Sequence, residues 1–207
     1  MSLGGGLGDK GLKLSLADTL RLAWADSDLR SRLLFVLMIF GVYALGIQIS
    51  VPIRGFDPNQ LENLIKDNPF FMLITTLGGG AIKRLSVFAL GLGPYISASI
   101  IMQVLTMTTP AWKKELQEGG EYARRQQNRR TRILTIVLCF AQAFALLQYM
   151  GEGVTGNLTP FDKVGVAIFW TCGAMFLLWL GEQVSERGIG NGVSLLIFAG
   201  IVISLPG

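Results

Sequence analysis

Few residues in this sequence could carry out chemistry. The 207 residues include no histidine and two cysteines, which leaves few ligands for a metal site or partners for a redox pair. Cys139 and Cys172 both lie in apolar runs, where cysteine behaves as a small buried hydrophobe. The run GIGNG at 188–192 resembles a nucleotide-binding loop, but no strand pattern precedes it, which favours a tight turn between helices. We therefore expect no catalytic residue, no metal site and no cofactor.

The remaining candidates are polar side chains inside apolar runs, where they could bind a small solute at mid-membrane. The evident ones are Ser97, Ser99, Gln103 and Gln142. Solute sites of this kind form at broken helices and usually recruit ionisable groups, and no charge lies inside these runs. Half of a small-solute secondary transporter is therefore the alternative function.

The element that must position these side chains is residues 78–106. It begins with a glycine triplet, continues with the adjacent cations Lys83 and Arg84, and then becomes apolar. No formal charge occurs from Leu85 to Trp112, and two glycines and Pro94 interrupt the first part of this run. Broken backbone at membrane depth persists only where protein covers it or water lines it. The pattern fits a kinked structural span as well as a conduction path.

The composition indicates a membrane protein. The chain is 51% hydrophobic with a mean hydropathy of +0.49, which is too apolar for a soluble domain of this size. Five apolar runs are long enough, at about 20 residues, to cross the hydrocarbon. These runs are 33–53, 85–109, 133–151, 164–181 and 188–207.

The sequence divides into three regions. Residues 1–13 are glycine-rich and predict a flexible tail. Residues 14–31 open with a capping-box pattern and predict an amphipathic helix on the cytoplasmic membrane surface. Residues 32–207 form the membrane unit.

The distribution of positive charge predicts the topology. If the short apolar run at 68–82 does not cross, thirteen Lys and Arg residues lie on one side and five on the other. If the run crosses, the division becomes eight against ten. Because cytoplasmic loops are enriched in Lys and Arg, the first arrangement is favoured. The N-terminus is then cytoplasmic, residue 207 is on the outer side, and residues 68–82 dip in from outside.

Three stretches carry a resemblance to a known family. They are LRSRLLF at 29–35, residues 78–105, and WLGEQVSERGIGNGVS at 179–194. From about Ser15 onward the chain resembles the N-terminal half of SecY, the central subunit of the bacterial protein-conducting channel. It departs at 51–56, an outer loop where the family commonly has a second proline near Arg54. The resemblance implies an all-α membrane protein with five transmembrane helices and a re-entrant plug, one half of an inverted-repeat channel.

The resemblance also implies the functional residues. It places a plug at residues 71–84, centred on Thr76, Leu77, Gly78, Gly79, Gly80 and Ala81. It places a pore ring at Leu92, Ile96, Val193 and Ile197, although ordinary helix packing uses the same four-residue spacing. It places one wall of the lateral gate at Ile96, Ser97 and Ile100.

A cytoplasmic basic loop lies at residues 113–132. Its cations could determine topology, bind anionic lipid or bind ribosomal RNA. Those singled out are Lys113, Lys114, Arg124, Arg125, Arg129 and Arg130.

The expected function is passive conduction of secretory proteins across, and insertion of membrane proteins into, the bacterial cytoplasmic membrane. The chain is not expected to be an enzyme, so a SecA motor or a ribosome would supply energy. The other implied partners are SecE-like and SecG-like subunits, unfolded polypeptide, membrane lipid, and the C-terminal half of the channel or an inverted copy. We expect that the chain alone is not a working translocon. An insertase acting as a half-channel is a further alternative.

Overall fold

The computed structural model describes residues 26–204 except residue 54. The expected tail at 1–13, most of the expected surface helix at 14–31 and the expected outer position of residue 207 lie outside the described residues. The backbone of Leu77 is described, but its side chain is not.

Helices make up the regular structure of the described residues. In chain order these are α2 (Ser27–Gln48), α3 (Pro58–Asp67), α4 (Pro69–Leu77), the 3-10 helix η1 (Ala81–Arg84), α5 (Gly93–Thr108), α6 (Pro110–Glu118), α7 (Gly120–Thr155), α8 (Pro160–Arg187) and α9 (Gly192–Ser204). An isolated antiparallel bridge joins Ser50 to Ser86.

Proline and capping side chains determine where many of these helices begin. Proline lies in the first turn of α3, α4, α5, α6 and α8, where its missing N–H group is not needed. The Asp57 carboxylate accepts hydrogen bonds from the N–H groups at the start of α3. Thr159 and Asp162 form a capping box at the start of α8. These local signals explain the helix starts that the apolar pattern alone does not give.

Three described helices, α2, α7 and α8, are long and apolar enough to cross a membrane. They contain the expected runs at 133–151 and 164–181 and most of the run at 33–53, although α2 begins at Ser27 rather than Leu33. Helix α9 is shorter and covers Gly192–Ser204 of the run at 188–207. The expected all-α membrane fold is confirmed.

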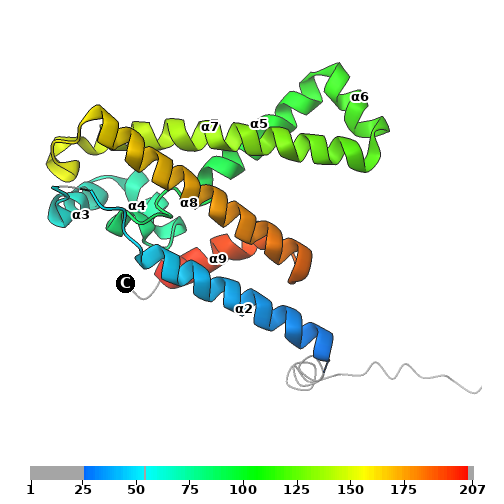
Figure 1. Cartoon of the computed structure of the whole chain (residues 1–207), viewed down its shortest axis with the longest axis horizontal. Helices are drawn as coiled ribbons and strands as arrows, with labels where there is room; N and C mark the ends of the chain where they lie inside the picture. The colour runs from blue at the N-terminus through cyan, green and yellow to red at the C-terminus, as the bar shows by residue number, and fades with distance from the viewer. Residues whose placement is uncertain (1–25, 54, 205–207) are drawn as a thin grey trace, which may run out of the picture.

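Helix α8 lies at the centre of the structure. It packs against α2, α7 and α9, and half of its most apolar window is buried, against 28% for α2 and α7. Figure 1 shows α3, α4 and the last turns of α7 gathered at one end and α6 near the other. Helices α2 and α7 therefore both run toward the end that holds α3 and α4, and α8 runs back from it.

Two further apolar runs contain α-helices that occupy only part of each run. The run at 68–82 contains α4, nine residues long and hence about 14 Å, less than half of the ~30 Å hydrocarbon thickness. That helix is therefore too short to cross the hydrocarbon alone, and the dip of residues 68–82 from the outer side stays a prediction. The run at 85–109 was expected to be one span, but helix α5 occupies only Gly93–Thr108. The first eight residues of that run are not helical, because two glycines and Pro94 interrupt the helix pattern.

The buried face of α7 is built from small residues. Thr131, Thr135, Cys139 and Ala143 are all buried at four-residue spacing, which lets α5 and α8 approach closely. Both threonine hydroxyls donate to the carbonyl oxygen four residues earlier, at 3.0 and 2.8 Å. Cys139 is buried as expected, but Cys172 is exposed on α8, so the expectation that both cysteines are buried is wrong for Cys172.

Candidate functional site

The non-helical segment 85–92 joins the expected plug to α5. Its backbone pairs with the chain that leaves α2: the Val51 N–H donates to the Leu85 carbonyl at 3.0 Å, and the Val87 N–H donates to the Ile49 carbonyl at 2.9 Å. Leu85 has a left-handed backbone (φ 45°), which is unusual for a residue with a side chain. The segment is therefore held by residues 49–51, which follow α2, and is not a free loop.

Segment 85–92 also lies directly against α8. A Cβ atom placed on Gly173 would overlap the Val87 carbonyl oxygen, so only glycine permits this approach. Leu85, Phe88 and Ala89 are buried in the two hydrophobic cores that flank the segment. These contacts fix the position of Leu92 and of the start of α5.

Three of the four expected ring residues line one cavity. Leu92, Ile96 and Ile197 surround a space of about 150 Å³ together with Ile74 and Gly78 of the expected plug. Leu92 is buried, whereas Ile96 is 38% exposed. The cavity is apolar, and the structure thus brings ring and plug residues together.

Val193, the fourth expected ring residue, lines a different space. It borders a polar pocket of about 500 Å³ between α5, α7, α8 and α9, and Ile96 lies between this pocket and the smaller cavity. Ser99 and Gln103 also line the pocket, but Ser97 and Gln142 line none of the pockets described here. The four polar residues considered for solute binding therefore do not gather at one site.

An ion pair in the polar pocket was not anticipated. The Arg132 guanidinium of α7 donates to the Glu182 carboxylate of α8 at 2.7 and 3.1 Å. The two residues are fifty positions apart in the sequence, so no local pattern indicates that they pair. This bidentate contact ties α7 to α8 at the edge of the pocket.

The expected gate residues lie on the open side of α5. Pro94, Ala98, Met102 and Thr106 form its buried line, and α5 packs against α7. Ile96 and Ile100 are 38% and 55% exposed, and Ser97 beside them is half-buried. An exposed apolar face on a helix that is anchored on its other side could open toward lipid or toward another helix.

The expected plug consists of α4, a glycine turn and η1. Gly79 and Gly80 have left-handed backbones (φ 65° and 77°), whereas Gly78 does not, so two glycines of the triplet are conformationally required. Ala81 is fully buried. The Ser204 hydroxyl of α9 donates to the Thr76 carbonyl at 3.0 Å and connects the plug segment to the last described helix.

With this geometry established, comparison with known proteins identifies the family. The sequence model of SecY matches residues 86–207, which include the ring residues, the gate residues and the whole α8–α9 turn. This chain belongs to the SecY family.

Curated SecY relatives agree with this assignment. Protein translocase subunit SecY of Pseudomonas aeruginosa is 45% identical over 184 residues, which cover 87% of this chain and 41% of that protein. The Aquifex aeolicus subunit is 35% identical over 200 residues, covering 92% of this chain and 46% of that protein. This chain thus spans less than half the length of these SecY relatives.

Solved channel structures share the fold. Sec61 in the canine ribosome-channel complex matches with a TM-score of 0.57 and 26% identity over 81% of this chain and 35% of that one. A SecY structure described for a plug domain that stabilises the closed state of the translocation channel matches with a TM-score of 0.56 and 27% identity, covering 81% of this chain and 34% of that one. The helices described above are therefore arranged as in part of a SecY or Sec61 channel.

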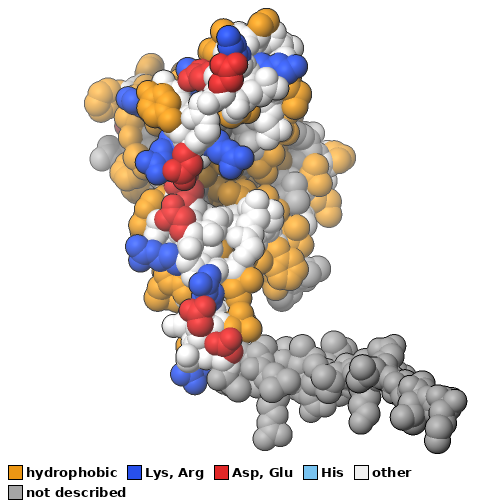
Figure 2. Space-filling model, turned by 90° about the vertical axis from the view of Figure 1, so that its right-hand side faces the viewer, with side chains coloured by type: hydrophobic (Ala, Val, Ile, Leu, Met, Phe, Trp, Pro, Cys, Tyr) orange, Lys and Arg blue, Asp and Glu red, His pale blue; other side chains and the backbone are white. Residues whose placement is uncertain are grey.

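The segment at 113–132, expected to be a basic loop, is helical in this SecY-family chain. It forms most of α6 and the first turns of α7, two helices that fold back on each other. Figure 2 shows Lys and Arg side chains interspersed with Asp and Glu on the face to which these helices contribute. A count of cations alone does not reveal these acidic partners.

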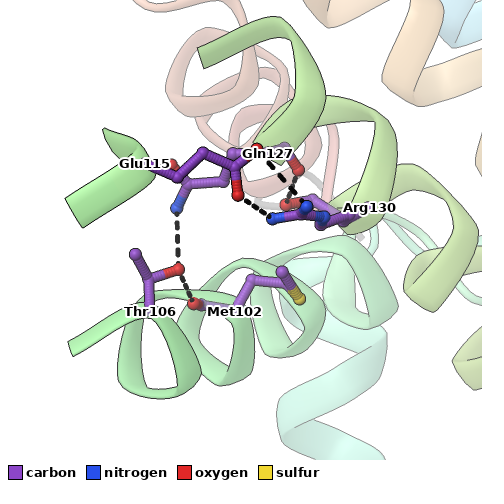
Figure 3. A network of polar contacts seen from close by, with 6 residues as sticks. Met102, Thr106, Glu115, Gln127 and Arg130 are labelled. Atoms are coloured by element: carbon purple, nitrogen blue, oxygen red, sulfur yellow. Dashed lines mark hydrogen bonds and ion pairs between the residues drawn. The ribbon is translucent and has the colours of Figure 1, made fainter. Parts of the chain in front are cut away.

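Arg130 has a structural role in this hairpin. Its guanidinium pairs with the Glu115 carboxylate at 3.0 Å and lies 4.7 Å from the centre of the Trp112 ring. Figure 3 shows this contact beside the hydrogen bond from the Gln127 amide to Thr106, which joins α7 to α5 at 3.4 Å. The Arg130 side chain is therefore engaged in contacts with α6. The other cations named for the basic loop are exposed: Lys113, Lys114, Arg124, Arg125 and Arg129.

We expect Arg130→Gln to loosen α6 from α7. It removes a half-buried ion pair and a cation–π contact, worth about 1–2 kcal/mol together. Hydrogen exchange of the amides in α6, followed by mass spectrometry, should become about tenfold faster. Arg125→Gln is the matched control, because the Arg125–Glu121 pair is fully exposed on α7. Equal acceleration in both variants would mean that the Arg130 contacts do not hold the hairpin.

Proposed function

We propose that this chain forms one wall, the plug and part of the seal of a protein-conducting channel. The channel conducts secretory proteins across the bacterial cytoplasmic membrane and admits membrane proteins into lipid. The observation that carries this proposal is the shared apolar cavity of Leu92, Ile96 and Ile197 with the plug residues Ile74 and Gly78. A narrow apolar neck resists water and ions without binding a particular sequence.

The plug proposal is supported by the construction of that segment. It is a short helix, a turn with two left-handed glycines and a 3-10 helix, and the Ser204 hydroxyl of α9 donates a hydrogen bond to its Thr76 carbonyl. A segment that is joined to its neighbours by turns can move without unfolding a long helix. In the proposed channel this segment closes the outer side and leaves when polypeptide passes.

The proposed topology follows from the positive-inside rule and from the directions in which α2, α7 and α8 run. The N-terminal region, α6, the start of α7 and the α8–α9 turn lie on the cytoplasmic side, and α3 and the plug lie on the outer side. Residues 14–31 would lie on the cytoplasmic membrane surface, and residues 32–207 would form the membrane unit. Exposed apolar side chains on α2, α5 and α7 are what lipid or neighbouring subunits would cover.

The proposed partners would supply the rest of the channel wall, the subunits that cover the outer helix faces, and the driving force. The C-terminal half of the channel, or an inverted copy of this chain, would complete the ring and the gate. SecE-like and SecG-like subunits would cover the outer helix faces, and a SecA motor or a ribosome would drive the unfolded polypeptide. The chain itself would conduct passively and catalyse no reaction.

Cross-linking the plug to α9 tests this function. Thr76→Cys and Ser204→Cys place thiols on two residues already joined by a hydrogen bond, with Cys172→Ser removing the exposed native thiol. We expect a reducible bis-maleimide bridge to abolish translocation by the channel assembled with the C-terminal part of the Pseudomonas relative. Reduction should restore it, because the plug can then leave.

Each single-cysteine variant treated with the same reagent is the control, since it carries the modification without the bridge. Translocation of a secretory protein into proteoliposomes is the measurement. Unchanged translocation with the bridge quantitatively formed would show that the segment is a static loop.

A further inference from the structure

A pocket of about 630 Å³ lies between the plug segment and three helices. Its floor and one wall come from α4, the glycine turn and η1, and the other walls come from the last turns of α2 and α9 and from α3. It is the largest of the pockets described here, and it is separate from the cavity of the ring residues.

Positive charge predominates around this pocket. Lys66, Lys83 and Arg84 line it against one carboxylate, that of Glu62. Lys66 pairs with Glu62 at 2.7 Å, and its hydrogen bond and charge lower the pKa of the Glu62 carboxyl, with a smaller contribution from Lys83. Glu62 is thus ionised and matched by Lys66. Within the described part of the chain, neither Lys83 nor Arg84 has a carboxylate within ion-pair distance.

Thr75 carries an unpaired hydroxyl beside this pocket. It lines the pocket and is 4% exposed, yet its buried hydroxyl makes no hydrogen bond. The threonines at 76, 106, 108, 131, 135, 155 and 171 all donate to the carbonyl oxygen four residues earlier. Thr75 sits in the same kind of helix without that bond. A buried unpaired hydroxyl is costly, so α4 carries an unsatisfied group beside the pocket, although the oxygen itself is not open to the pocket.

We propose that this pocket binds one phosphate-type anion. Arg84 offers a guanidinium suited to two phosphate oxygens, and Lys83 beside it offers a compact charge. The source is either inorganic phosphate or the phosphodiester of an anionic phospholipid head group, for which the pocket is large enough. An apolar rim that includes Ile47 and Ile203 suits the start of a lipid chain.

An anion bound in this pocket would affect the movement of the plug. This effect on the plug rests on the proposed function, whereas the binding itself does not. The proposed ligating residues Lys83 and Arg84 belong to the plug segment, while the opposite walls belong to α2, α3 and α9. A bound anion would therefore tie the plug to its surroundings and favour the closed arrangement. Binding itself can be measured on the chain alone, so a failed channel assay would not affect it.

The test uses the full 207-residue chain in nanodiscs of phosphatidylcholine with and without phosphatidylglycerol. Native mass spectrometry should show one retained phosphatidylglycerol, and Lys83→Gln and Arg84→Gln should each weaken retention about fivefold. Lys83→Arg should keep retention, because it keeps the charge. Lys163→Gln is the matched control: Lys163 is on the same proposed side, hydrogen-bonds Gln148 and does not line the pocket.

A second arm distinguishes the two sources. In phosphatidylcholine nanodiscs, inorganic phosphate should raise the thermal midpoint of unfolding if free phosphate is the ligand, and leave it unchanged if the lipid is. Thr75→Val keeps the side-chain shape and removes a buried hydroxyl that is not open to the pocket, so it should leave binding of either ligand unchanged. The proposal is overturned if neither ligand binds, or if binding is equal in the Arg84→Gln, Lys83→Gln and Lys163→Gln chains.

Discussion

Gly173→Ala is expected to lower the free energy of unfolding by about 1–3 kcal/mol, the usual cost of an extra methyl group in a packed interior. The added Cβ would overlap the Val87 carbonyl oxygen, which is backbone and cannot rotate away. Segment 85–92 would have to move off α8, and with it Leu92 and the start of α5. Denaturant titration of the purified chain in mixed micelles, monitored by circular dichroism, gives the free energy.

Gly165→Ala on the same helix is the matched control. No atom lies within 4 Å of a Cβ placed on Gly165, so alanine there should leave stability unchanged or raise it by up to about 1 kcal/mol through helix propensity. Equal losses in the two variants would contradict the account, because they would indicate a general intolerance of α8 rather than a contact with Val87.

Much of the fold could be predicted from the sequence, because its signals are local. Apolar runs predict α2, α7 and α8, and Pro94 with its neighbouring glycines predicts a break before α5. The α6 hairpin was missed because its charges indicated a loop. Pro110 at its start and a glycine pair at 119–120 are helix boundary signals that could have identified it.

The site was predictable only in part, because its contacts join distant segments. Spacing places Leu92 and Ile96 on one face, but it cannot show that Ile197 joins them at a cavity while Val193 borders another. The turn between α8 and α9 decides this: the Ser185 hydroxyl accepts from the Gly192 N–H at 2.9 Å and donates to the Gly181 carbonyl at 3.0 Å. The hydrogen bond across this turn leaves no hydrophobic periodicity in the sequence.

The second large effect is expected at the seal. Ile96→Asn should raise the resting ion conductance of the assembled channel at least about tenfold, because an amide at the apolar neck favours water there. Ile96 borders both the ring cavity and the polar pocket, so it is the single residue whose change connects them. The variant should also accept substrates with weaker signal sequences, because a signal sequence then has a less stable closed state to open.

Ile101→Asn is the matched control for that variant. Ile101 is on the same helix with nearly the same exposure, 40% against 38%, and lines neither cavity. Both changes place an amide at an exposed position of α5, so both should have similar effects on folding in the membrane. The two variants differ only in whether the altered side chain reaches the proposed passage.

Resting conductance of the Ile96→Asn channel in a planar bilayer tests the central claim, that these residues close a passage through the protein. The channel is this chain assembled with the C-terminal part of the Pseudomonas relative, with equal amounts of folded Ile96→Asn and Ile101→Asn protein. The account predicts a persistent ion leak with Ile96→Asn and a closed channel with Ile101→Asn. A closed channel in both, or the same leak in both, would contradict it.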